Sequence, residues 1–189
     1  MSTGTVRNPG QVVGSLVAIV FGVVFVVVNS GGLAAPWPVL VRIAGLAVAA
    51  VLLVALLAGR RRPAPADTDR AGGGDGPGGS TFFGYRRFWL IVAAEAVALF
   101  AGLYVINGVL GHPEVAVAWI AVVVGVHFFG LGWAFRLGRF HLLGAAMTAL
   151  GVAGFVLDAA GAGAPVVSLV SGVLSGVALF AAAGYSLVR

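Results

Sequence analysis

The sequence predicts an all-α fold, a polytopic bundle of six transmembrane helices arranged as three antiparallel hairpins. Two observations support this prediction. Of the 189 residues, 60% are hydrophobic and 9% are charged, and the mean hydropathy is +1.09, whereas a soluble domain has about 25% charged residues. The apolar residues also come in runs of about 20, the length at which a helix crosses the hydrocarbon core of a bilayer. The lipid bilayer is therefore the expected partner of this chain.

Six apolar segments follow one another along the chain. Most are rich in Val, which favours strands in water, but an isolated strand in lipid leaves its backbone groups unpaired. A transmembrane barrel would show polar residues at alternate positions, and these runs are apolar on every side. We therefore predict helices at residues 11–29, 37–58, 88–109, 114–135, 140–160 and 164–187.

One long polar stretch interrupts this series between the second and third segments. Pro, Gly and Asp dominate residues 63–80, and such a composition cannot bury enough apolar surface to offset the entropy of ordering. We predict a disordered cytoplasmic linker there. The predicted organisation is a cytoplasmic N-terminus (1–10), a first hairpin (11–58), the linker (59–87), a second hairpin (88–135) and a third (136–189).

The positions of the arginines predict the orientation of the chain. Cytoplasmic loops of membrane proteins carry an excess of Lys and Arg, and this chain has eleven Arg and no Lys. Ten of the eleven fall on one side of a six-helix serpentine, and the opposite connections (29–36, 107–113 and 158–165) contain none. We expect both termini inside. The bias toward Ala, Gly, Val and Arg suggests a bacterial source, so the expected location is a bacterial plasma membrane.

The N-terminal segment allows a second interpretation. Arg7, the apolar stretch after it and Gly32-Leu33-Ala34 resemble a signal peptide with a small-x-small cleavage site. The stretch of roughly 17 apolar residues is longer than a signal-peptide core and long enough for a span. We therefore prefer an uncleaved first helix, with cleavage as the alternative.

Composition also argues against several classes of function. The net charge is +5, but the arginines lie at the ends of apolar segments, so no nucleic-acid partner is expected. The absence of Cys excludes disulfides, thiolate metal sites and cysteine nucleophiles. The glycines of residues 72–79 are followed by no Lys-Ser/Thr pair and preceded by no strand, so they form no phosphate loop. We expect no cofactor, and the sequence disfavours an enzyme without excluding one.

The three connections without Arg share a pattern, in which an Asn or Asp ends one helix and a Pro opens the next. A shift of 129 positions (151 − 22) superimposes the first and third of them, which indicates a threefold hairpin repeat. The glycine-rich pattern at residues 22–41 and 151–170 resembles the HdeD-type six-helix membrane proteins of bacterial acid resistance. Residues 125–131 resemble a segment of uncharacterised bacterial membrane proteins. Both resemblances concern the fold and imply no activity.

Two ionisable residues inside predicted spans are the main candidates for function, because such groups are costly in lipid. Glu95 lies eight residues after Arg87, and His127 lies nine residues before Arg136. At 1.5 Å per residue both are roughly 12–14 Å from the same side, so two antiparallel helices would bring them together. The pair would act as a proton relay or cation site. The alternative, which we prefer, is a hydrogen-bonded pair that fastens the hairpin.

A second candidate pair lies near the opposite side. Arg42 is the one Arg that breaks the orientation pattern, and it would either snorkel outward or form an ion pair with Asp158 or Glu114. Binding of an anionic substrate or lipid headgroup is the alternative. His112, Glu114 and Asp158 could ligate a divalent cation, but they lack the spacing of a metal motif. We expect them to be solvated loop residues and predict no metal site.

Two further patterns concern packing. Trp37, Trp89, Trp119 and Trp133 lie near segment ends and are expected to anchor the chain at the membrane interfaces. Ser168, Gly172 and Gly176 form a small-xxx-small face, which packs closely within the chain or, alternatively, in a homo-oligomer.

Three classes of function remain. The preferred class is an integral membrane protein with a structural, stress-related or partner-binding role and an unknown protein partner. The alternative is a small proton-linked transporter or channel that uses Glu95 and His127. A membrane-embedded enzyme is the least favoured.

Overall fold

The computed structural model describes residues 9–60, 80–135 and 138–188, and every regular element in these ranges is helical. The predicted all-α class is confirmed. A π-helical segment, η1, continues α3; a 3-10 turn, η2, opens α4; and a second π-helical segment, η3, joins α6 to α7. The elements are α1 (Pro9–Asn29), α2 (Trp37–Arg60), α3 (Ser80–Tyr104), η1 (Val105–Leu110), η2 (Pro113–Val115), α4 (Ala116–Phe135), α5 (Gly138–Ala159), α6 (Ala164–Val167), η3 (Ser168–Val173) and α7 (Leu174–Val188).

Five helical stretches are long and apolar enough to cross a membrane: Trp37–Ala58, Val92–Leu110, Pro113–Trp133, Gly138–Ala159 and Ala164–Leu187. In α1 the apolar part, Gly14–Asn29, is shorter. Length and composition therefore place the chain among multi-pass membrane proteins. The ends of these five stretches lie within four residues of the helices predicted from the apolar runs.

The predicted linker, residues 59–87, is corrected at both ends. Helix α2 continues to Arg60, and α3 begins at Ser80, eight residues before the predicted start. A helix satisfies its own backbone hydrogen bonds and can extend beyond the hydrocarbon core when Pro is absent, and residues 80–87 contain none. The remainder of the predicted linker, residues 61–79, lies outside the described residues.

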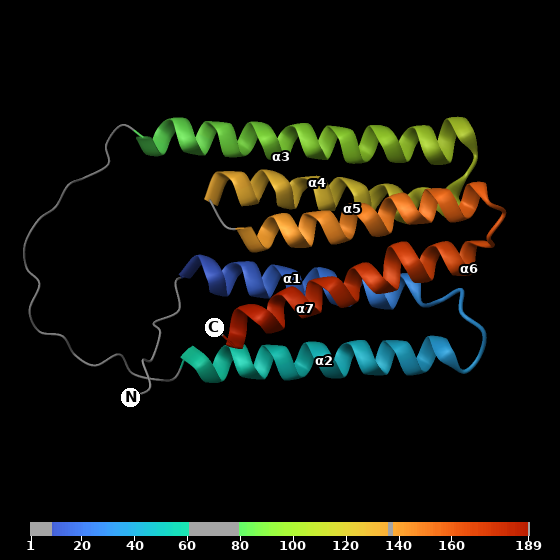
Figure 1. Ribbon diagram of the computed structural model, residues 1–189, viewed down its shortest axis with the longest axis horizontal. Helices are drawn as coiled ribbons and strands as arrows, with labels where there is room; N and C mark the ends of the chain where they lie inside the picture. Colours follow the sequence, from blue (N-terminus) through green and yellow to red (C-terminus); the bar gives the residue numbers. More distant parts are fainter. Residues whose placement is uncertain (1–8, 61–79, 136–137, 189) are drawn as a thin grey trace, which may run out of the picture.

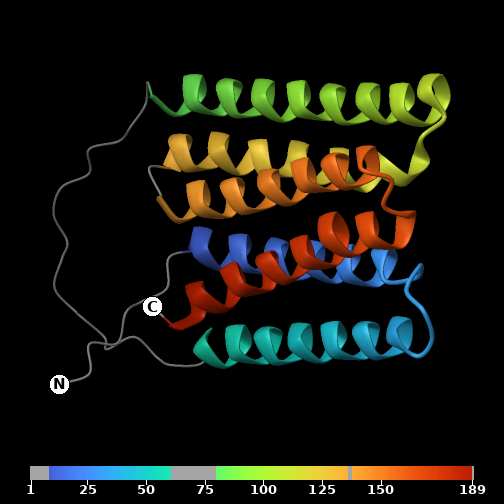
Figure 2. The ribbon, with the colours of Figure 1, turned by 45° about the vertical axis from the view of Figure 1, so that its right-hand side comes forward.

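The helices lie side by side in four layers (Figures 1 and 2). The two middle layers are the pairs α4–α5 and α1–α7, which have the most extensive helix contacts in the described chain. Helix α3 lies outside the first pair and α2 outside the second. The connections α1–α2, η1–η2 and α5–α6 all lie at one end of the bundle, opposite the start of α1 and the end of α7 (Figure 1).

Glycines allow close packing between the helices of both central pairs. In the first pair, a Cβ built on Gly125 would lie 2.6 Å from the backbone nitrogen of Thr148, so α4 and α5 meet almost backbone to backbone. In the second pair, Cβ atoms on Gly172 and Gly176 would lie 2.3 Å from Cβ of Asn29 and 2.8 Å from the carbonyl oxygen of Gly22. The small-residue face of the last helix is therefore used within the chain.

The π-helical segment η3 lies where the two central pairs meet. It packs against α1, α4 and α5. The hydroxyl of Ser171, which is fully buried, donates a hydrogen bond of 2.9 Å to the carbonyl of Leu150 on α5. A Cβ on Gly154 would lie 1.9 Å from that hydroxyl oxygen, so the glycine leaves room for it. This buried contact joins one pair to the other.

The second and third connections of the predicted hairpin repeat share a backbone conformation that the first connection lacks. Gly111 (φ +69°) and Gly161 (φ +84°) both end a helix in the left-handed region, which glycine adopts without a steric penalty. Gly32, which the repeat aligns with Gly161, has no positive φ. The first connection therefore turns by another route.

Candidate functional site

The structure brings Glu95 and His127 together. Glu95 lies on α3 and His127 on α4, and Nδ1 of His127 makes a hydrogen-bonded ion-pair contact with Oε2 of Glu95. Their side chains retain 20% and 28% of their accessible surface, so both are mostly covered. The similar depth of the two residues along neighbouring helices predicted this contact. Each side chain therefore satisfies the other at a depth where an unpaired charge would be costly.

The same seam contains a second, apolar contact between α3 and α4. Trp119 lies eight residues before His127 on α4, and Gly102 lies seven residues after Glu95 on α3. Both spacings are about two helical turns, so the two contacts lie on one face of each helix. A Cβ on Gly102 would lie 2.1 Å from Nε1 of Trp119. The indole ring therefore fills the space that the glycine leaves.

This position corrects the prediction that Trp119 is an interfacial anchor. Its indole Nε1 is buried and makes no hydrogen bond, so the ring contributes packing and no polar contact. Trp37, Trp89 and Trp133 are instead largely exposed on the helix surfaces, in keeping with the predicted anchoring.

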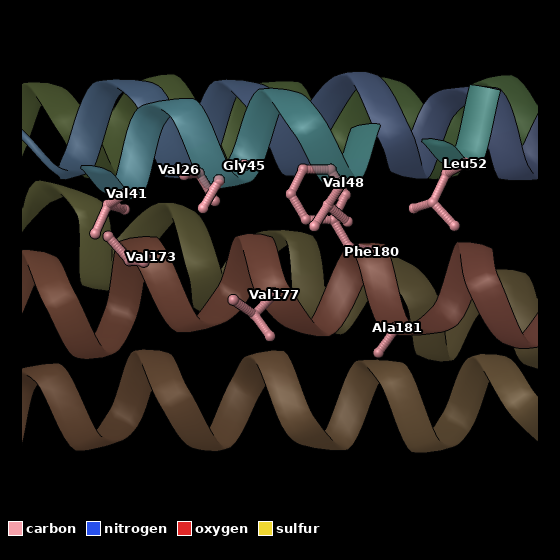
Figure 3. A pocket seen from close by; sticks show the side chains of 10 residues that line it. Val26, Val41, Gly45, Val48, Leu52, Val173, Val177, Phe180 and Ala181 are labelled. Atoms are coloured by element: carbon pink, nitrogen blue, oxygen red, sulfur yellow. The ribbon is translucent and has the colours of Figure 1, made fainter. Parts of the chain in front are cut away.

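An apolar groove of about 380 Å³ lies between α2 and α7, with α1 behind it. Figure 3 shows side chains of α2 and α7, among them Val48 and Val177, pointing into it, with Val26 of α1 at its back. No lining residue is charged, and the lining includes neither Glu95 nor His127. This groove therefore provides no polar route to the pair.

The structure does not bring Arg42 and Asp158 together. Nε of Arg42 donates hydrogen bonds to the carbonyl of Val27 at 3.2 Å and to the hydroxyl of Ser30 at 3.1 Å. The arginine thus binds the end of α1, where carbonyl groups lack helical partners. The predicted ion pair is absent because α2 lies on the far side of the α1–α7 pair from α5, which carries Asp158 (Figures 1 and 2).

His112, Glu114 and Asp158, which we expected to be solvated loop residues, form a cluster. One potential ligand atom from each of His112, Glu114 and Asp158 lies within 4.8 Å of the others. Nδ1 of His112 and Oε1 of Glu114 share a hydrogen bond of 2.7 Å. The sequence already grouped these residues as possible cation ligands, but their proximity depends on two connections far apart in the chain: His112 and Glu114 flank Pro113, and Asp158 lies near the end of α5.

Sequence reasoning missed the partners of Arg42 and the role of Ser171. The signal for Ser30 was available, because it follows the end of the first helix and Arg42 lies near the start of the second. Ser171 was not among the candidate residues, although Ser and Thr hydroxyls often bond across helices in lipid.

The fold and this arrangement define a class, the multi-pass helical membrane protein. The comparisons add no narrower assignment: no protein family, curated protein or solved structure matches this chain.

Proposed function

We propose that this chain is a structural or partner-binding protein of a bacterial plasma membrane, with six spanning helices as three antiparallel hairpins. A stress-related role belongs to the same proposed class. Both termini are inside. The positions of Arg60 at the end of α2 and Arg139 at the start of α5 support this orientation, because both helix ends lie at the same end of the bundle (Figure 1).

An uncleaved first helix belongs to the same proposal. Ile19, Phe25 and Val26 of α1 are buried in the core, and Gly22 packs against Phe180 and Gly176 of α7. Removal of α1 would expose the glycine face of α7 to lipid and leave the groove without its back wall.

The closed Glu95–His127 contact is the observation that carries the proposal. Transporters place several polar groups and interrupted helices around a central site. Here the two polar side chains pair with each other, and the Trp119–Gly102 contact lies on the same face of the two helices. The groove between α2 and α7 is apolar and apart from them. This arrangement favours a role in fastening α3 to α4.

The outer surface of α3 supports partner binding. Leu90, Val97 and Phe100 are 61%, 68% and 69% exposed. The extensive contacts of α3 are with α4 and with its own continuation η1, which leave this face uncovered. Lipid solvates such a face in the isolated chain, and a second transmembrane helix, from another protein or from a second copy, can pack on it.

Proton-linked transport is the competing function, because an imidazole beside a carboxylate can exchange protons near neutral pH. Proton flux into proteoliposomes decides between the two. We expect the parent protein to give the flux of empty liposomes, and Glu95→Gln and His127→Ala to change nothing. Arg42→Gln serves as the control for altering an intramembrane charge elsewhere. Flux in the parent that both pair variants abolish and the control retains would establish transport instead.

A further inference from the structure

Three side chains of the kinds that bind metals converge at the end of the bundle that carries the turns. His112 and Glu114 flank Pro113 at the start of η2, and Asp158 is the penultimate residue of α5. Two connections far apart in the sequence thus supply one cluster, whose potential ligand atoms all lie within 4.8 Å of one another. The side chain of His112 is 59% exposed and that of Glu114 is 29% exposed, so ions can reach the cluster from water.

The charges of this cluster are not balanced. Glu114 and Asp158 are both acidic, and residues 105–115 and 156–165 contain no Arg or Lys. Arg42 is occupied with Val27 and Ser30 at the end of α1. The carboxylate of Asp158 makes no hydrogen bond or ion pair within the described part of the chain, while the carboxylate of Glu114 has a backbone hydrogen bond and the contact with His112. One imidazole thus faces two carboxylates, which repel each other, and a divalent cation would offset that repulsion.

The donor set also indicates which cation fits. One imidazole nitrogen and two carboxylate oxygens suit a transition metal such as Zn²⁺, whereas Ca²⁺ and Mg²⁺ prefer oxygen ligands alone. Ligands about 2.1 Å from a tetrahedral zinc are roughly 3.4 Å apart. Turn side chains reach that spacing from 4.8 Å by small rotations. Water would fill the fourth position.

We propose that His112, Glu114 and Asp158 form a binding site for a divalent transition metal, with Zn²⁺ as the best fit. The bound ion joins the η1–η2 connection to the end of α5. Because it binds the folded chain, it stabilises the bundle by mass action. The proposal goes beyond the function proposed above and does not depend on the orientation of the chain or on the role of Glu95 and His127.

Titration of the full-length protein in detergent with ZnCl₂ alone, after removal of any affinity tag, tests the site. We expect saturable binding of one ion per chain. Asp158→Asn and His112→Gln should each weaken binding by at least about tenfold, as loss of a ligand does in metal sites. His141→Gln is the matched histidine control, since His141 lies near the other end of α5 against Phe129. Asp75→Asn is the matched acidic control.

Two further measurements keep the result decisive. Circular dichroism of each metal-free variant shows whether it folds, and Co²⁺ bound to the parent protein should give the visible absorption of a four- or five-coordinate site. The proposal is overturned if the parent shows no saturable Zn²⁺ binding or no such Co²⁺ spectrum. It is equally overturned if the folded Asp158→Asn and His112→Gln variants bind Zn²⁺ as tightly as the controls.

Discussion

Helices α2 and α3 occupy equivalent outer positions but are held in different ways. Each lies outside a tightly packed pair (Figures 1 and 2). In the most apolar stretch of α2, 11% of the residues are buried, and in that of α3 with η1, 6%, against 50% in the stretch that contains α7. Helix α2 packs against both α1 and α7, whereas α3 packs extensively against α4 alone among the described elements other than its own continuation.

The contacts match this difference in the number of neighbours. Gly45 of α2 lies against Val26, and Val41 and Leu52 line the groove shared with α7. Helix α3 has the Glu95–His127 contact and the space at Gly102 that Trp119 fills. Lipid is as apolar as the helix surfaces, so apolar burial alone does not drive helices together in a membrane. A helix with one neighbour therefore depends on a polar pair and close steric fit.

The largest effect is expected from Gly102→Leu. A Cβ at this position would lie 2.1 Å from Nε1 of Trp119, so the indole ring would have to shift. Overpacking of this kind costs about 1–3 kcal/mol, which should separate α3 from α4. Spin labels on Val97→Cys and Val126→Cys report this separation, because both sites are exposed and the chain has no native Cys.

Gly108→Leu, in the continuation of α3, is the control for placing a leucine at a glycine position. A Cβ on Gly108 would meet the Tyr104 ring at 3.6 Å, an ordinary contact, so the distance between the labels should stay that of the parent. Equal distances in both variants would show that Gly102 does not hold α3 in place.

A smaller effect is expected from the polar pair. Glu95→Ala, His127→Ala and the double variant form a cycle that isolates the energy of the contact. Hydrogen bonds between membrane helices contribute about 0.6 kcal/mol on average and up to about 1.7 kcal/mol. We expect a coupling energy in this range from unfolding in mixed micelles. A value of zero would mean that the pair contributes nothing to holding α3.

The smallest effect is expected from Arg42→Leu on α2. The hydroxyl of Ser30 also contacts the carbonyl of Val27, so that carbonyl keeps a donor when the guanidinium is removed. Helix α2 keeps its apolar contacts with two neighbours. The free energy of unfolding should therefore change by less than about 0.5 kcal/mol, as at tolerant sites. A loss as large as that of Glu95→Ala would remove the contrast between the two outer helices.

The positions of the helices could be predicted from the sequence, but their neighbours could not. Apolar runs of membrane length fix where a helix lies, and short connections place consecutive helices near each other. The pair α4–α5 follows this rule, but the other close pair, α1–α7, joins helices that are far apart in the sequence. Glycine contacts such as Gly22 with Gly176 decide this pairing. One glycine-rich helix looks much like another in sequence, so the pattern does not say which two faces meet.

The candidate site residues also include one contact that the sequence predicted and others that it did not. Glu95 and His127 were predictable because depth and chain order both restrict them. The partner of Arg42 depends on which side of α1 carries α2, and the cluster around Asp158 depends on two connections that approach in space. Neither fact is encoded in a local pattern. The depth of a residue along its helix can thus be predicted from hydropathy, whereas the choice of neighbouring helices requires the structure.

The packing of α1 against α7 has a consequence for biosynthesis. Helix α1 leaves the ribosome well before its main partner α7, and a hydrogen bond between Ser15 and Ser186 joins the two helices. Until α7 has been synthesised, α1 can reach only part of its native contacts. A chain that stops before residue 174 has no α7, so Gly22 of α1 lacks its contacts with Gly176 and Phe180. Synthesis of α7 is thus the step that completes the native packing of α1.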